Sequence, residues 1–200
     1  MPWDVTHKTK SKEKILICAA KLFVAKGFDA VGINDVMKSA NMTRGAFYAH
    51  FKSKADLYNQ ALVVAAFEAR ENITQGCDQG FASLQHNYLQ QGQDPTLKDN
   101  QQCPIALLIS DIRQREPLVR ETYEKVFKGF VKYIESQGLT EAEALKEAAT
   151  MIGAVALSES LTDKKLVEKL LAACEGLGAK YTLRSKVTFA QGEMSCFDLS

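Results

Sequence analysis

Apolar residues recur at intervals of three and four through nearly all of this 200-residue sequence, and this spacing is the strongest constraint on its fold. It places apolar side chains on one face of an α-helix, whereas a half-buried strand needs strict alternation. No convincing strand pattern, internal repeat or low-complexity tract occurs before residue 180. A chain of this length can bury a sizeable core without disulfides or metal. The sequence therefore predicts an all-α protein.

The first sixty residues predict three helices in quick succession. A long first helix covers about 9–26 and stops at Gly27, which can adopt the left-handed conformation. A short second helix, about 33–40, ends at Asn41, and Thr43 is placed to cap a third helix. Two short helices joined by a turn of about three residues form the layout of a helix-turn-helix.

The rest of the sequence predicts further helices separated by polar or glycine-containing breaks. They cover about 53–73, 81–91, a buried stretch opened by Cys103 and Pro104, 117–134, 140–160 and a last helix capped by Thr162. Thr140 and Glu143 have the spacing of a capping box at the start of the helix at 140–160. The polar segment 92–102 is expected to be a loop.

Charge is divided unevenly along the chain, although the net charge is only +1. Residues 1–60 contain ten lysine and arginine residues and five acidic residues, whereas the remainder contains fifteen and nineteen. A basic segment on a nearly neutral chain favours a polyanionic partner for that segment alone. A solvated lysine-rich helix is the alternative, and charge by itself does not separate the two.

Several classes of protein are disfavoured by the sequence. Its apolar runs are too short for a membrane span, and the apolar stretch 15–25 is broken by Lys21 and lacks a cleavage site, so we expect a cytoplasmic protein without membrane contact. The five cysteines form no CxxC pair, which argues against a zinc site or a disulfide framework. Because no glycine-rich phosphate loop, HExxH or GxSxG occurs, we expect no enzymatic activity, no catalytic residue, no metal and no cofactor.

The most informative stretch is TRGAFYAHFKSKADLY, residues 43–58. A helix that enters the major groove needs small residues at its closest approach, and Gly45 and Ala46 are small. Arg44 stands at the start of this helix, where it can reach a base edge or a phosphate, and Tyr48 follows one turn later on the same face. The expected DNA-contacting residues are Thr43, Arg44, Gly45, Ala46, Tyr48, His50 and Lys54. Any one of them alone could be an ordinary packed or solvated side chain, but the combination is much less expected by chance.

Residues 8–62 resemble the N-terminal domain of the tetracycline-repressor (TetR) family. The resemblance rests on a first helix ending AAKLFVAKGFDA, on INDVMKSANMTRGAFYAHF, and above all on Phe-Tyr-x-His-Phe-x-x-Lys-x-x-Leu at 47–57. Val31 and Gly32 depart from the pattern where many members carry hydroxyl residues that touch phosphate, and Asn41 replaces the commoner glycine. The resemblance implies an all-helical homodimeric repressor that binds a palindromic operator in double-stranded DNA and senses a small-molecule effector.

On this basis we expect a helix-turn-helix DNA-binding domain at 1–53, a helical effector-binding and dimerisation domain at 54–180, and an unassigned tail at 181–200. The helices at 140–160 and 163–177 both carry apolar stripes that could pair two copies of the chain. Small residues that would permit close approach are Ala148, Ala149, Gly153, Ala154 and Ala156. The alternative is that these stripes only complete the core of one chain.

Cys103 is the candidate for a reactive thiol. It follows the polar segment and precedes Pro104, so we expect it at a helix N-terminus, where the helix dipole lowers the pKa of a thiol and solvent can reach it. An electrophile or oxidant would then be the effector. The alternative is that Cys103 is a cap or core residue and that a reversible ligand binds beneath the helices at 81–134.

Two other functions compete with a DNA-binding regulator. An all-helical enzyme finds no support in the motifs. A helical interaction module whose helix-turn-helix no longer binds DNA would share the same pattern, and a salt-dependent mobility-shift assay would distinguish it.

Overall fold

The computed structural model describes residues 5–74, 80–90 and 103–178, and within these ranges it is built of helices without a strand. The helices are α1 (Val5–Ala30), α2 (Ile33–Ser39), α3 (Arg44–Tyr48), α4 (Lys54–Thr74), α5 (Phe81–Gln90), α6 (Pro104–Leu107), α7 (Ile109–Ile112), α8 (Pro117–Glu135), α9 (Glu141–Ser160) and α10 (Lys164–Gly178). The predicted all-α fold is confirmed. The predicted loop at 92–102 and the tail at 181–200 lie outside the described residues.

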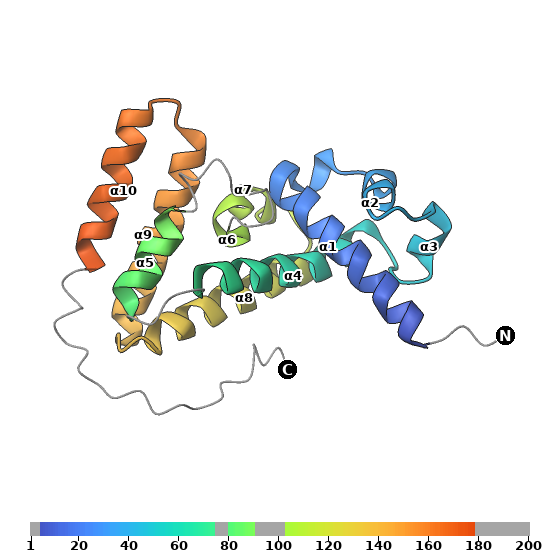
Figure 1. The fold of residues 1–200 in the computed structure, drawn as a ribbon, viewed down its shortest axis with the longest axis horizontal. Coiled ribbons are helices and arrows are strands. Elements are labelled where there is room, and N and C mark those ends of the chain that lie inside the picture. Colours follow the sequence, from blue (N-terminus) through green and yellow to red (C-terminus); the bar gives the residue numbers. More distant parts are fainter. Residues whose placement is uncertain (1–4, 75–79, 91–102, 179–200) are drawn as a thin grey trace.

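Two groups of helices lie at opposite ends of the molecule (Figure 1). We call α1, α2, α3 and the first part of α4 the head, residues 5–65, and the described residues from 66 onward the body. In the head, α1 packs against α4 and α2, and α2 contacts α3. The long helices α4 and α8 lie side by side and connect the two ends, while α9 and α10 pair at the far end of the body (Figure 1).

Each group has its own cluster of buried apolar side chains. The head core includes Ile15, Phe23, Phe47, Leu57 and Tyr58, and the body core includes Leu84, Tyr88, Ile134, Ala148 and Met151. The clusters meet inside α4, where Ala65 belongs to the head core and Ala66 to the body core. The division at residues 53 and 54 therefore stays a proposal about function, since packing runs across it.

Local sequence signals set the geometry of the head. Gly27 has a φ of 74°, so it interrupts α1 as predicted, and one further turn follows to Ala30. Asn41 has a φ of 55°, which confirms that it closes α2 in the left-handed conformation. These two residues turn the chain sharply and bring α2 and α3 against α1 and α4.

The buried helix predicted after Cys103 is wrong in one respect, because it is broken into α6 and α7. Leu108 separates them with φ −96° and ψ 5°. Ile105 packs into the body core, whereas Leu108 and Ile112 pack into the head core. Because of this break, one short segment contributes side chains to both cores. A single straight helix could not direct these side chains toward both.

The ends of α9 and α10 test two predicted caps. The pair Thr140 and Glu143 is confirmed, since the Thr140 side chain accepts from the Glu143 N–H at 3.4 Å and the Glu143 carboxylate accepts from the Thr140 N–H at 2.9 Å. The cap predicted at Thr162 is wrong by one residue. The Asp163 carboxylate accepts from the N–H groups of Lys165 and Leu166 instead. Among the described helices, none is both long and apolar enough to cross a membrane.

Candidate nucleic-acid interface

The two sides of α3 differ sharply in exposure. Phe47 is fully buried in the head core, with its ring centroid 5.6 Å from that of Phe51. The next residue, Tyr48, is 60% exposed, and Arg44 is exposed one turn earlier. Phe47 thus anchors α3 while Arg44 and Tyr48 are exposed to solvent. Helix α3 itself lies at the end of the head that points away from the body (Figure 1).

Thr43 occupies the N-cap position of α3, as predicted, with an extended backbone at φ −79° and ψ 153°. Its hydroxyl makes no capping hydrogen bond, so the predicted side-chain cap is wrong although the boundary is right. Phe47 after it belongs to the head core, and Met42 before it is partly buried against the same core. The exposed Thr43 hydroxyl is left at the surface beside the start of α3.

Lack of space does not explain the glycine at position 45 in the described part of the free protein. A methyl group added there would meet the Thr43 Oγ1 at 3.9 Å, an ordinary contact. Alanine would favour the helix over glycine by about 1 kcal/mol. Packing within the described part of the chain therefore gives no reason for glycine at this exposed position.

Residues of α1 lie beside α3 at the candidate interface, and they were not predicted from the sequence. Lys8 and Ser11 line a surface groove together with Gly45, Ala46 and His50. Burial lowers the pKa of His50 below its usual value, and the charges of Lys8 and Lys12 lower it further. The i, i+4 spacing of Lys8 and Lys12 on a predicted helix was the available signal, since such residues share a face.

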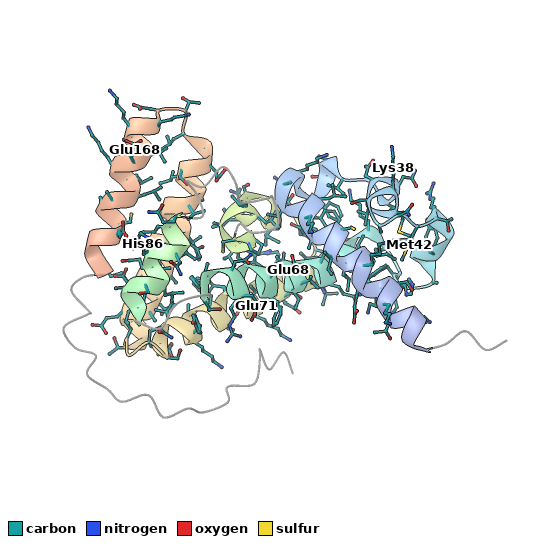
Figure 2. All side chains as sticks on the ribbon, in the orientation of Figure 1. Lys38, Met42, Glu68, Glu71, His86 and Glu168 are labelled. Atoms are coloured by element: carbon teal, nitrogen blue, oxygen red, sulfur yellow. The ribbon has the colours of Figure 1, made fainter. Side chains whose placement is uncertain are left out.

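A second groove lies between α2 and the start of α3. Lys38, Asn41 and Met42 line it together with Thr43 and Arg44. Lys38 and Met42 lie toward the outer end of the head (Figure 2). Basic side chains therefore flank α3 from both α1 and α2, and the surface around the helix is suited to a polyanion.

Lys54 is separated from the other predicted contact residues. Six of the seven lie on α3 or at its ends, whereas Lys54 begins α4. Its Nζ lies 4.2 Å from the centroid of the Phe28 ring, a cation–π contact with the end of α1. In the free protein this side chain is therefore directed toward the boundary with the body.

A polar cluster, here called the Asp111 latch, joins α7 to the head. One carboxylate oxygen of Asp111 accepts a hydrogen bond from the Tyr58 hydroxyl at 2.5 Å and from the Phe28 N–H at 3.4 Å. The other carboxylate oxygen of Asp111 lies 3.3 Å from one guanidinium nitrogen of Arg115. The two terminal nitrogens of Arg115 also donate to the two carboxylate oxygens of Asp29, at 2.8 and 3.2 Å. The latch comprises these five residues and connects α7 to the end of α1 and to α4.

The protonation of the latch follows from its surroundings. Burial raises the pKa of the Tyr58 phenol well above its usual value, and the hydrogen bond to Asp111 raises it further. The hydrogen bond from Arg115 lowers the pKa of Asp29. The latch therefore holds Tyr58 as a neutral donor across the neutral pH range, as its contact with the carboxylate requires.

A narrow cavity lies in the body among α4, α5, α6 and α8. Its walls include Ala69, Arg70, Tyr88, Cys103, Phe130 and Tyr133. The cavity has a volume of about 30 Å³. If Cys103 is not a reactive thiol, the sequence predicts a reversible ligand beneath the helices at 81–134. The cavity lies in that region.

The expectation for Cys103 needs correction. It occupies the N-cap of α6, as predicted, but it is only 5% exposed. Burial raises the pKa of its thiol, and this effect exceeds the opposing effect of the backbone N–H groups of Ala106 and Ile105. Neither solvent access nor a lowered pKa is found, because Cys103 forms part of the cavity wall beside Tyr88.

Comparisons with known proteins agree with this arrangement. Residues 15–61 match the model of the family described as bacterial regulatory proteins, tetR family. The uncharacterized HTH-type transcriptional regulator YxaF of Bacillus subtilis is 27% identical over 84% of this chain and 94% of its own length. The IcaR negative transcriptional regulator of the icaADBC biofilm operon in Staphylococcus aureus is 39% identical, over 31% of this chain and 33% of its own length.

The fold also matches solved structures. A TetR transcriptional regulator from Chloroflexus aurantiacus superposes with a TM-score of 0.72 at 22% identity, covering 90% of this chain and 98% of that one. The match of the helix-turn-helix segment, the near full-length relative and the shared fold all point the same way. Together these matches support a regulator of the tetR family, with the family's pattern at residues 15–61 and the fold of solved TetR regulators over most of the chain.

Proposed function

We propose that this regulator binds double-stranded DNA through α3 and acts as a repressor. The observation that carries the proposal is the division of α3 between a buried anchor, Phe47, and an outer face formed by Arg44 and Tyr48. Recognition helices read bases from exposed residues near their N-terminus while the domain holds the helix in place. The IcaR relative is a negative regulator, which supports repression.

The residues of α3 take roles that follow from their positions. Arg44, at the start of the helix, reads a base edge, ideally guanine, or else binds a phosphate. Gly45 and Ala46 allow the backbone to approach the groove closely. The exposed Tyr48 hydroxyl donates to a phosphate.

Residues around α3 supply sequence-independent contacts. Thr43 and His50 flank the helix and meet phosphates on either side. Lys54 joins them by leaving the Phe28 ring when DNA approaches. Lys8 and Lys12 extend the same basic surface along α1.

A homodimer formed through α9 and α10 is the working unit of this proposal, because two-fold pairing matches a palindromic operator. The outward residues of α9 at helical spacing are Leu145, Ala149, Gly153 and Leu157. Leu145 and Leu157 are 43% and 51% exposed, and a methyl group at Gly153 would meet nothing within 4 Å. Light scattering should give a dimer mass for the wild type and a monomer mass for Gly153→Glu, with Leu118→Glu on α8 as the control.

Two of the small residues expected to serve this pairing do not face outward. Ala148 and Ala154 are buried in the body core of the single chain. The proposed pairing surface is therefore narrower than the sequence alone predicts.

Release from DNA by a small effector completes the proposal, and the path between cavity and head supports it. Cys103 and Ile105 line the cavity, and the chain continues through Leu108 into α7, which carries Asp111. A ligand that widens the cavity would displace these short helices and, through the latch, the head. The energetics require only that the ligand bind the DNA-incompetent arrangement more tightly.

The test begins with the full chain selecting fragments from the genome that encodes it, followed by mobility-shift assays on the fragment recovered. Arg44→Ala should weaken specific binding by about 1–3 kcal/mol if Arg44 reads a base. Arg120→Ala, an exposed arginine on α8, is the matched control and should bind like the wild type. Equal operator affinity of Arg44→Ala and wild type would contradict the base contact.

The backbone contacts have a different signature in the same assay. Tyr48→Phe and Lys54→Ala should weaken binding to all sequences alike, and Lys54→Ala should also flatten the dependence on salt. Recovery of no fragment, with no salt-dependent binding to any DNA, would favour a helical interaction module instead. Contact with the chromosome requires the protein to act in the cytoplasm.

A further inference from the structure

The chemistry of the body cavity can be argued from one buried hydroxyl. Tyr88 is fully buried and lines the cavity, and its hydroxyl has no hydrogen-bond partner within the described part of the chain. The Cys103 thiol lies beside it, but sulphur is a weak partner for a phenol. Burial raises the pKa of the Tyr88 phenol well above its usual value, so it remains a proton donor. A buried donor left unpaired is unfavourable, and a ligand that accepts its hydrogen bond removes that penalty.

The walls around this hydroxyl are flat. The Tyr88 and Phe130 rings are stacked, with centroids 5.3 Å apart and an interplanar angle of 26°. On the α4 side, the Arg70 guanidinium lies 5.2 Å from the centroid of the Tyr133 ring. Aromatic rings and a stacked guanidinium present planar surfaces that favour a planar ligand.

We propose that the cavity binds a small, flat, uncharged aromatic compound whose single polar oxygen accepts a hydrogen bond from Tyr88. This inference rests on the proposed function, in which the body holds the effector. The ligand is uncharged because most of the lining is apolar and burying an ion there is costly. An aromatic ketone is the simplest compound that meets these conditions.

The present size of the cavity explains how such a ligand would act. A space of about 30 Å³ accommodates one or two water molecules, whereas a cavity known to hold benzene measures about 150 Å³. An aromatic ring therefore enters only if a wall moves. The four-residue α6 is the shortest element in that wall, and its displacement would carry α7 and Asp111 with it.

The experiment uses the full chain and a pair of probes matched in shape. Acetophenone has the carbonyl oxygen, and α-methylstyrene replaces it with a methylene group. Calorimetric titration of the wild type should show acetophenone binding about three- to tenfold more tightly, the range of one neutral hydrogen bond. In Tyr88→Phe the preference should disappear because acetophenone loses affinity while α-methylstyrene does not.

Two variants control for changes in packing. Tyr123→Phe removes another tyrosine hydroxyl near α6, one that already donates to the Ile105 carbonyl at 2.6 Å, and it should keep the preference for acetophenone. Ala69→Leu fills the cavity and should abolish binding of both probes while operator binding persists.

Several results would overturn the inference. They are equal affinity of the wild type for both probes, survival of the preference in Tyr88→Phe, tighter binding of benzoate than of acetophenone, or no binding of any probe at millimolar concentration. The same preparations are assayed for operator binding. If they bind the operator but fail with the probes, the ligand class is wrong and the DNA-binding proposal stands.

Discussion

The head and the body each bury a tyrosine completely, and the two tyrosines differ in whether the hydroxyl has a hydrogen-bond partner. Tyr58 in the head donates its hydroxyl to Asp111. Tyr88 in the body has no hydrogen-bond partner within the described residues and lies against a cavity. A polar group that is satisfied helps to fix one arrangement, whereas an unsatisfied one leaves free energy for a ligand to recover. The comparison indicates that the site around Tyr58 is held in one arrangement, whereas the site around Tyr88 can gain a hydrogen bond from a ligand.

The largest expected effect tests whether the two regions also differ in packing. Phe47→Ala removes a fully buried ring from the head core and should lower the free energy of unfolding by about 3–5 kcal/mol. Phe130→Ala should cost less, because one side of that ring already faces the cavity and has fewer contacts to lose. Chemical denaturation of both variants measures the difference. A larger loss for Phe130→Ala would mean that the body is packed as tightly as the head.

The two tyrosines give a smaller and more direct comparison. Tyr58→Phe should destabilise the protein by about 1.5–3 kcal/mol, since it removes a hydrogen bond to a carboxylate that stays buried against the head. Tyr88→Phe should be neutral or slightly stabilising, because it deletes an unpaired buried hydroxyl. Thermal and denaturant unfolding of the pair, with circular dichroism as the readout, checks both values. Equal destabilisation would remove the distinction between the two sites.

A third prediction concerns the pH dependence of the head. In the free protein the pKa of His50 lies below its usual value, so His50 is mostly neutral at pH 7. A DNA phosphate beside it would favour the protonated form, so the complex would hold a proton that the free protein lacks. Affinity must then rise as pH falls through the pKa of the complex and level off below the pKa of the free protein.

The size of this effect is limited to one proton, less than about tenfold in affinity per pH unit. Mobility shifts at constant ionic strength between about pH 7.5 and 6 measure it. His50→Gln should abolish the dependence. His86→Gln is the control, because His86 lies in the body and pairs with Glu175. An unchanged pH profile in His50→Gln would show that His50 does not meet a phosphate.

The sequence predicted those features that depend on residues close together along the chain. Gly27, Asn41 and the Thr140–Glu143 cap act within about four residues, and all three are found in the structure. The helix-turn-helix could be identified for the same reason. The cap at Thr162 failed because two adjacent residues could fill that role and the carboxylate of Asp163 did so.

Features that depend on helix packing could not be predicted in the same way. The contact of Asp111 with Tyr58 joins residues 53 positions apart, and no local pattern marks either one. The break at Leu108 follows from the presence of two cores, which periodicity within one helix does not reveal. The environment of Cys103 was mispredicted for the same reason, since burial at a helix N-terminus depends on what packs over it.

The smallest expected effect is at Cys103. A thiol that is 5% exposed, with a pKa raised by burial, presents little thiolate to an electrophile. Titration of the protein–operator complex with an electrophile should therefore release DNA equally from wild type and Cys103→Ser, or from neither. Cys18→Ser, at a partly exposed cysteine of α1, reports reaction elsewhere in the chain. Release from wild type alone would show that the cavity opens often enough to expose the thiol, and the body would then sense reactive compounds through the wall that otherwise receives a reversible ligand.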